Sequence, residues 1–232
     1  DARCLWIKPS VKYLTEYLHN NNIDAIISTG PPHSMHMIAL ELRKKFNIPW
    51  IADFRDPWTK IDFYEQLKLT KLADKKHHKL ELEVLQTADK IVTVSNSCAK
   101  DLEAICNKKV EVITNGFDTI PKDIEKEKFY KENFVISHIG VLPENRNAPI
   151  LWKALSELTT ENKTFGDKLK IELIGHVDGS ILEDIKKLNL NSYLKTTEYI
   201  PHDKVIAKQK MASLLLLLIN KTKNSKGILT GK

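Results

Sequence analysis

Three charged side chains stand within four residues of one another at the end of a predicted strand. Asp53, Arg55 and Asp56 follow the apolar run 49–53 and alternate with aromatic residues. Charges beside a buried strand are costly unless they are paired, so Arg55 could bridge the two carboxylates structurally. The same residue types could do chemistry, because a carboxylate orients an acceptor hydroxyl while a guanidinium binds a phosphate or sugar oxygen. Both interpretations remain open.

Two turns could bring backbone groups to a ligand. The stretch TGPPHS carries Gly30 and His33 between a predicted strand and a helix whose first N–H groups could face an anion. Taken by itself, the stretch is better explained as a proline-shaped loop with Ser34 as a helix cap. Asn115 and Gly116 predict a tight turn after another strand, and in a two-domain enzyme that turn would lie at the cleft.

The second half repeats this arrangement. Gly140 follows the run 134–139, and Arg146 stands six residues later at the start of a predicted helix. Glycine lets backbone approach a ligand, and arginine near a helix N-terminus suits a diphosphate. The residues at the ends of the next two strands could enclose a base: Gly175 with His176, and Tyr199 with Ile200.

A predicted helix over 66–88 carries lysines at spacings of three and four, namely Lys68, Lys71, Lys75 and Lys79. This spacing places them on one face. Such a face is usually only solvated, but it could also bind an anionic membrane surface or a lipid-linked phosphate acceptor. The adjacent His77 and His78 lack an acidic or cysteine partner at a ligand-like offset, so no metal site is predicted.

Short β-branched runs alternate with helical patterns, which predicts parallel sheets. The predicted strands are 24–28, 49–53, 90–94, 110–114, 134–139, 169–174, 193–200 and 213–219, and the helices are 33–46, 66–88, 96–106, 147–161, 179–189 and 202–211. Because the strands are mostly apolar throughout, we expect a doubly wound α/β fold with helices on both sheet faces. The charged segment 118–133 predicts a boundary between domains 1–122 and 123–232.

Composition narrows the classes of function. Thirty acidic residues are mixed with 36 basic ones, and no nucleic-acid-binding motif is present, so no nucleic-acid partner is predicted. Three cysteines without a CxxC pair indicate a reducing, cytoplasmic location. The longest apolar run, 214–219, is too short to span a bilayer. The chain begins with Asp1 rather than Met, so we expect residues before it.

The motifs TGPPHS, PWIADFRDPW, ADKIVTVS, VITNGFD and IGVLPENRN, followed by the helix ALSEL, resemble glycosyltransferase family 4 over nearly the whole chain. The resemblance is strongest to bacterial enzymes of surface-polysaccharide assembly. It implies a GT-B fold of two Rossmann-like domains, both incomplete here. It also implies retaining transfer from a nucleoside-diphosphate sugar to a glycan or lipid-linked acceptor, of the hexosyltransferase type, with no essential metal and no cofactor.

The resemblance also implies residue roles. Arg146 and Lys232 fall where the family places cations on the donor diphosphate, and Gly140 falls at its close-approach glycine. Gly175 and the pair Tyr199–Ile200 would line the base pocket. The acidic cluster at 53–56 stands where many members carry a histidine. The family's first strand is missing and the ending GILTGK opens a longer motif, so the fragment could be inactive by itself.

Three alternatives remain at this point. A nucleotide-sugar 2-epimerase would share the fold and the donor pocket. A non-catalytic module could bind a nucleotide or an anionic surface. A dinucleotide-dependent oxidoreductase is disfavoured, because no predicted strand is followed by GxGxxG.

Overall fold

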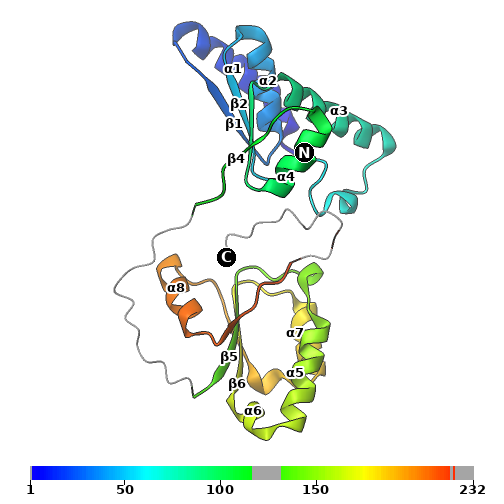
Figure 1. Ribbon diagram of the computed structural model, residues 1–232, viewed down its shortest axis with the longest axis vertical. Coiled ribbons are helices and arrows are strands. Elements are labelled where there is room, and N and C mark those ends of the chain that lie inside the picture. Colours follow the sequence, from blue (N-terminus) through cyan, green and yellow to red (C-terminus); the bar gives the residue numbers. More distant parts are fainter. Residues whose placement is uncertain (1, 117–131, 220–221, 223–232) are drawn as a thin grey trace. The chain divides into compact units, whose positions relative to one another are not determined.

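The computed structural model describes residues 2–116, 132–219 and 222 (Figure 1). The chain forms two compact units, which in the described ranges contain residues 2–116 and residues 132–219, and Thr222 belongs to the first unit. The predicted boundary between residues 122 and 123 lies outside the described residues. Within the described part, no helix is both long and apolar enough to span a bilayer.

The first unit is a parallel sheet with strand order β1-β2-β3-β4. Its elements are η1 (Ala2–Trp6), α1 (Ile7–Asn20), β1 (Ile26–Gly30), α2 (Ser34–Phe46), β2 (Trp50–Phe54), η2 (Tyr64–Leu67), α3 (Lys71–Thr87), β3 (Lys90–Thr93), α4 (Asn96–Cys106) and β4 (Glu111–Val112). Each strand pairs with the next one along the chain. Right-handed crossovers of this kind place α2, α3 and α4 on the same face of the sheet.

The core of the first unit lies on that face. Trp50, Ala52 and Phe54 of β2 are fully buried against apolar residues of α2, α3 and α4. The alternate residues of the strands point to the other face, where Ile51 is half-buried and Ile27 is 70% exposed. The strands of this unit therefore alternate between a covered and an open face, whereas the sequence predicted strands that are apolar on both faces.

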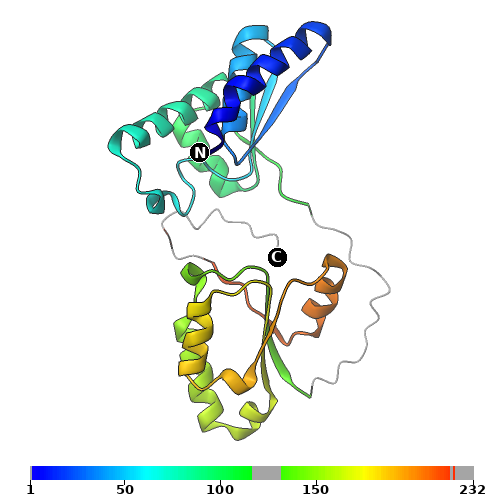
Figure 2. The same cartoon turned by 180° about the vertical axis from the view of Figure 1, so that it is seen from behind.

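The second unit is a parallel sheet with strand order β7-β6-β5-β8. Its elements are β5 (Phe134–Ile139), η3 (Glu144–Arg146), α5 (Pro149–Glu161), α6 (Lys163–Lys168), β6 (Leu169–Ile174), α7 (Gly179–Lys187), η4 (Asn191–Tyr193), β7 (Leu194–Thr197), α8 (His202–Met211) and β8 (Leu214–Leu215). The chain moves outward from β5 to β7 and then returns to the other side of β5. This reversal places α8 on the face opposite α5 and α7, as both views show (Figures 1 and 2), and makes the sheet doubly wound.

Several predicted elements have the bounds that the structure gives, including β5, β6, α4 and α8. Two helices, α1 and α6, were not predicted. The predicted helix over 66–88 begins only at Lys71, because the side chain of Thr70 caps it by accepting from the N–H of Ala73. Lys68 lies before this cap, with a left-handed φ of 46°, so it does not belong to the helix.

Candidate functional site

The carboxyl end of the first sheet brings the first predicted residues together. Thr29 and Asp53 are direct partners in the β1–β2 register. The Thr29 hydroxyl donates to Asp53 Oδ2 at 2.7 Å. Both side chains alternate with buried residues of their strands and so belong to the open face of the sheet.

Arg55 does not bridge the two carboxylates, contrary to that structural expectation. Its Nη2 donates to the carbonyl oxygen of Pro31 at 3.2 Å, and Asp53 is engaged by Thr29 instead. No ion pair joins Arg55 to Asp53 or Asp56 among the described residues. Burial raises the pKa of Asp56, and the nearby Arg55 opposes this shift. Asp56 therefore binds a proton more readily than an ordinary aspartate does.

Behind this loop lies a stack of aromatic rings. His36 stacks on Phe54 with centroids 4.4 Å apart, and His33 stacks on Trp58 at 4.8 Å with an interplanar angle of 4°. Burial lowers the pKa of His33 to about 4 and that of His36 to about 3, and in each case a neighbouring histidine adds to the shift. Both rings are therefore neutral at pH 7. They hold the loops after β1 and β2 against each other.

Gly30 is required by this stack. A Cβ at position 30 would lie 2.6 Å from His36 Nε2 and 2.8 Å from His33 Nδ1. Both nitrogens are buried and have no hydrogen-bond partner in the described structure. The structure thus places the predicted pair Gly30 and His33 at the sheet edge, but His33 packs there through its ring face, with Nδ1 turned inward.

Sequence reasoning missed the bonds that fasten the loop after β2 to α3. Trp58 Nε1 donates to His77 Nδ1 at 2.9 Å. Glu81, fully buried, accepts from both the N–H and the hydroxyl of Thr59. Burial raises the pKa of Glu81, and the bonds from Thr59 oppose the rise. The available signal was spacing: Glu81 falls on the same helical stripe as Val84 and Leu85, both buried.

The predicted turn at Asn115 and Gly116 continues into residues that the structure does not describe, so it stays a prediction. Both residues follow β4, and both are exposed. A Cβ on Gly116 would meet nothing within 4 Å, so no steric need for glycine exists there. Because β4 lies two strands away from β2 in the sheet, these residues are at the far end of the edge that carries Asp53.

The carboxyl end of the second sheet is built from backbone. Gly140 and Gly175 follow the adjacent strands β5 and β6 with φ angles of 119° and 109°. A Cβ on Gly175 would lie 2.8 Å from the carbonyl oxygen of Gly140. Each glycine continues the ladder, Gly140 N–H donating to Ile174 O at 2.7 Å and Gly175 N–H to Thr197 O at 2.8 Å. The two glycines permit a contact that no other residue would allow.

The loop carrying Arg146 is fixed at both ends. Leu142 donates to His176 O and accepts from the N–H of Asp178, each at 2.9 Å. At the other end, Asn147 donates to Asp184 Oδ2 at 2.8 Å and accepts from Trp152 Nε1 at 2.8 Å. Arg146 is half-buried between these anchors, three residues before α5 begins.

The remaining donor-side predictions lie along the same edge. His176 is exposed after β6, and Tyr199 after β7 is 85% exposed, with Ile200 half-buried beside it. Because β7, β6 and β5 are neighbours, the structure brings their carboxyl-end residues to one edge. Lys232 lies outside the described residues. In the described ranges, no group of three or more His, Cys, Asp or Glu side chains could hold a metal ion.

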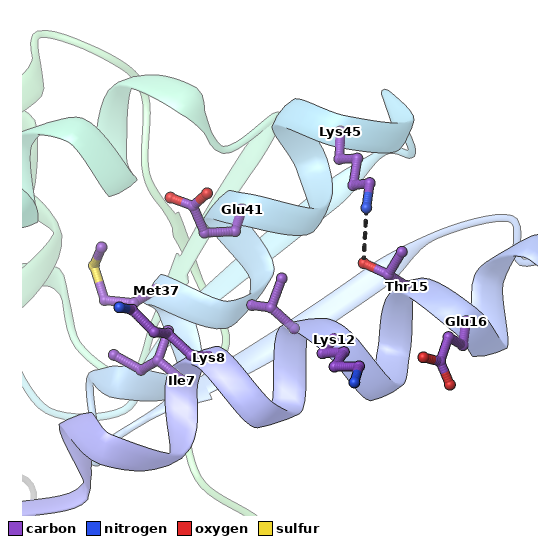
Figure 3. Close-up of a pocket in the computed structure, with 9 residues that line it drawn as sticks. Ile7, Lys8, Lys12, Thr15, Glu16, Met37, Glu41 and Lys45 are labelled. Carbon is purple, nitrogen blue, oxygen red and sulfur yellow. Dashed lines mark hydrogen bonds between the residues drawn. The ribbon is translucent and has the colours of Figure 1, made fainter.

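A groove of about 560 Å³ lies elsewhere in the first unit, between α1 and α2. Its apolar floor includes Ile7 and Met37, and Lys8, Lys12 and Lys45 line its rim (Figure 3). Lys45 Nζ approaches the Thr15 hydroxyl at 3.4 Å. None of the predicted functional residues lines this groove, and the sequence did not predict α1.

Residues 1–120, more than half of the chain, match the family described as Glycosyltransferase Family 4. The chain belongs to glycosyltransferase family 4. Its two parallel four-stranded sheets have the Rossmann-like architecture of the GT-B fold, as predicted. No match to a curated protein sequence was found.

Solved structures support this family member's fold. The N-terminal domain of Candida albicans trehalose-6-phosphate phosphatase is 13% identical with a TM-score of 0.64, covering 93% of this chain and 54% of that one. The apo lipopolysaccharide outer core galactosyltransferase WaaB is 15% identical with a TM-score of 0.56, covering 96% and 57%. S. aureus MnaA bound to UDP is 12% identical with a TM-score of 0.51, covering 90% and 56%. The chain thus spans little more than half of each structure, and the likeness concerns the fold alone.

Proposed function

We propose that this family 4 glycosyltransferase transfers a sugar, with retention of configuration, from a nucleoside-diphosphate sugar to a glycan or lipid-linked acceptor in bacterial surface-polysaccharide synthesis. One observation carries the proposal. In a chain of this family, Gly140 and Gly175 let two backbone segments meet at the edge where Arg146 is anchored. Such an edge lets a diphosphate approach the backbone closely and brings a cation to it.

The donor would bind along the edge of the second sheet. Arg146, with Lys232 as a second cation, would stabilise the negative charge that develops on the diphosphate as the glycosidic bond breaks. These cations would do the work that a metal ion does in other transferases. Gly175, His176, Tyr199 and Ile200 would surround the base.

The acceptor would bind at the edge of the first sheet. A front-face reaction, in which a phosphate oxygen of the leaving group accepts the acceptor's proton, requires no carboxylate nucleophile. Asp53 and Arg55 would orient acceptor oxygens, and Asp56, with its raised pKa, would donate a hydrogen bond when protonated. The three cysteines are free, which accords with a cytoplasmic location.

Thermal unfolding tests the donor site. We would compare the midpoint of the chain with UDP, GDP or ADP, each with and without EDTA. A ligand at about one hundred times its dissociation constant adds about 2.7 kcal/mol to stability. We expect one nucleotide to stabilise the chain regardless of EDTA, and Arg146→Ala to abolish the shift while the exposed Lys186→Ala retains it. Equal shifts in both variants would contradict the role of Arg146.

A nucleotide-sugar 2-epimerase remains the second candidate, because the fold is shared with a putative UDP-N-acetylglucosamine 2-epimerase from Listeria monocytogenes, which is 12% identical with a TM-score of 0.54. The two reactions differ in whether they require an acceptor. An epimerase converts its nucleotide sugar without an acceptor, so a changed sugar configuration in the recovered nucleotide sugar would replace the transferase proposal. A non-catalytic module would bind a nucleotide but yield neither product with the full-length protein.

A further inference from the structure

The exposed side of α3 combines a leucine with four lysines. Lys71, Lys75 and Lys79 form one row at spacings of four, and Lys76 lies beside it. Leu72 stands between them, three residues from Lys75 and four from Lys76, and is 83% exposed. All four lysines are exposed as well. We call these five residues the α3 basic face. Lys68, which the sequence placed on the same stripe, lies before the helix cap.

The acidic residues of α3 do not neutralise this face. Asp74 accepts from the Tyr64 hydroxyl at 3.0 Å, and its Oδ1 lies 3.3 Å from His78 Nδ1. Glu83 pairs with Lys44 at 2.6 Å, and Glu81 is buried. None of the four lysines forms an ion pair with a residue that the structure describes.

The segment before α3 also carries exposed side chains. It adds two partly exposed apolar side chains, Phe63 and Leu67. Its own acids, Asp62 and Glu65, leave the balance positive, since six lysines stand against three acidic residues between positions 60 and 79. Figure 1 shows this segment and the start of α3 at the margin of the first unit, away from its sheet. Cations and exposed apolar side chains therefore lie close together along this stretch of the chain.

We propose that the α3 basic face, with Phe63 and Leu67, docks on an anionic lipid bilayer. Lysines near such a surface contribute about 1 kcal/mol each. Their long aliphatic stems can lie against the apolar boundary while the ammonium groups stay at the level of the charged headgroups. Leu72 at the centre of the face would enter the boundary with the acyl chains, which accounts for an exposed leucine among cations.

The structure connects this face to the proposed acceptor site. The bonds Trp58–His77 and Thr59–Glu81 fasten the loop after β2 to α3. That loop begins with Arg55 and Asp56 and is held on the core-facing side of α3, so docking through α3 would fix the position of the loop relative to the bilayer. The acceptor would then be lipid-linked rather than a soluble glycan. This last step rests on the proposed function, whereas the docking itself does not.

Vesicle flotation tests the proposal. The 232-residue chain would be floated with vesicles of phosphatidylcholine alone and with vesicles in which about one lipid in three is phosphatidylglycerol. We expect binding only to the second kind, and loss of binding in strong salt. Each lysine removed lowers the partition coefficient about fivefold, so Lys71→Glu with Lys75→Glu should abolish it. Leu72→Ser should lower it about tenfold.

Two matched controls make the result specific. Leu5 is 85% exposed in the same unit, so Leu5→Ser removes an equally exposed leucine. Lys186→Glu with Lys187→Glu reverses two cations on α7. Both control variants should bind like the wild type. Equal binding to neutral vesicles, no binding to anionic ones, or equal losses in test and control variants would overturn the proposal. Nucleotide-induced thermal shifts, measured on the same variants, report separately on the proposed transferase function.

Discussion

The loops at the carboxyl ends of the two sheets are held in place by different kinds of contact. In the first unit, the loops after β1 and β2 are held by side chains, chiefly the stack of His36, Phe54, His33 and Trp58. In the second unit, the loops after β5 and β6 are held by backbone, through the Gly140–Gly175 contact and the hydrogen bonds of Leu142. Contacts between side chains, as in the first unit, change with pH and with sequence. Contacts between backbone groups, as in the second unit, do not depend on protonation, but they leave no space for a side chain.

The largest expected difference between the two units is in their stability at acid pH. The pKa of His36 is lowered from the ordinary histidine value of 6.5 to about 3 in the folded state, and that of His33 to about 4. Because the unfolded chain binds more protons, these residues leave stability unaffected above pH 6.5 and reduce it as pH falls from 6.5 toward 3. At about 1.4 kcal/mol per pKa unit, the shift of His36 alone lowers the free energy of unfolding of the first unit by roughly 5 kcal/mol once the pH has fallen to about 3. The measurement is denaturant unfolding at several pH values.

Tryptophan fluorescence separates the two units in that experiment. Trp50 and Trp58 report on the first unit, and Trp152 reports on the second. The raised pKa of Glu81 acts in the opposite sense in the first unit, since the folded carboxyl gains its proton above pH 4.5. The variant His36→Phe should flatten the pH dependence. Acid unfolding of the second unit first, or an unchanged slope in His36→Phe, would contradict this account.

A methyl group at position 175 should produce the next largest effect. Gly175→Ala places a Cβ against backbone at 2.8 Å, at a φ of +109°. We expect a loss of about 3 kcal/mol from the second unit and loss of nucleotide binding. Gly116→Ala is the matched control, because its Cβ would meet nothing within 4 Å, and it should be neutral. A tolerated Gly175→Ala would show that the two backbones are not held in contact.

A smaller effect is expected at the anchor of Arg146. Asn147→Ala leaves the indole N–H of the buried Trp152 without its acceptor, which costs about 2 kcal/mol. Nucleotide affinity should also fall as η3 loses its tie to Asp184. In the double variant with Trp152→Phe the orphaned donor is gone, so the combined stability loss should be less than the sum of the two single losses. Strict additivity, measured by denaturant unfolding, would argue against this bond.

The sequence predicted the positions of helices and strands better than it predicted the contacts between side chains. Apolar runs and helix signals located β5, β6, α4 and α8, and the rule that parallel strands end at one edge brought Gly140, Gly175 and Tyr199 together. It missed α1, although apolar residues recur there at helical spacing, because Pro9 interrupts the pattern. Pro9 lies in the first turn of α1, where a helix tolerates proline since the first N–H groups have no partner within the helix.

Pairwise contacts were the part that local sequence could not supply. Arg55 was expected to meet neighbouring carboxylates, but the Pro31 carbonyl, 24 residues away, accepts its hydrogen bond. Likewise, Glu81 accepts from Thr59 across 22 residues of sequence, and Trp58 donates to His77 across 19 residues. Such partners depend on how loops fold over strands, which no local spacing records.

The most direct test of the central claim is an amide NMR titration of the chain with the nucleoside diphosphate that stabilises it most. If the edge of the second sheet is the donor site, the largest shifts should occur at Gly140, Arg146, Gly175 and His176, and Arg146→Ala should remove them. Shifts confined to the first unit, or spread evenly over both units without saturation, would contradict the assignment of this edge as the donor site.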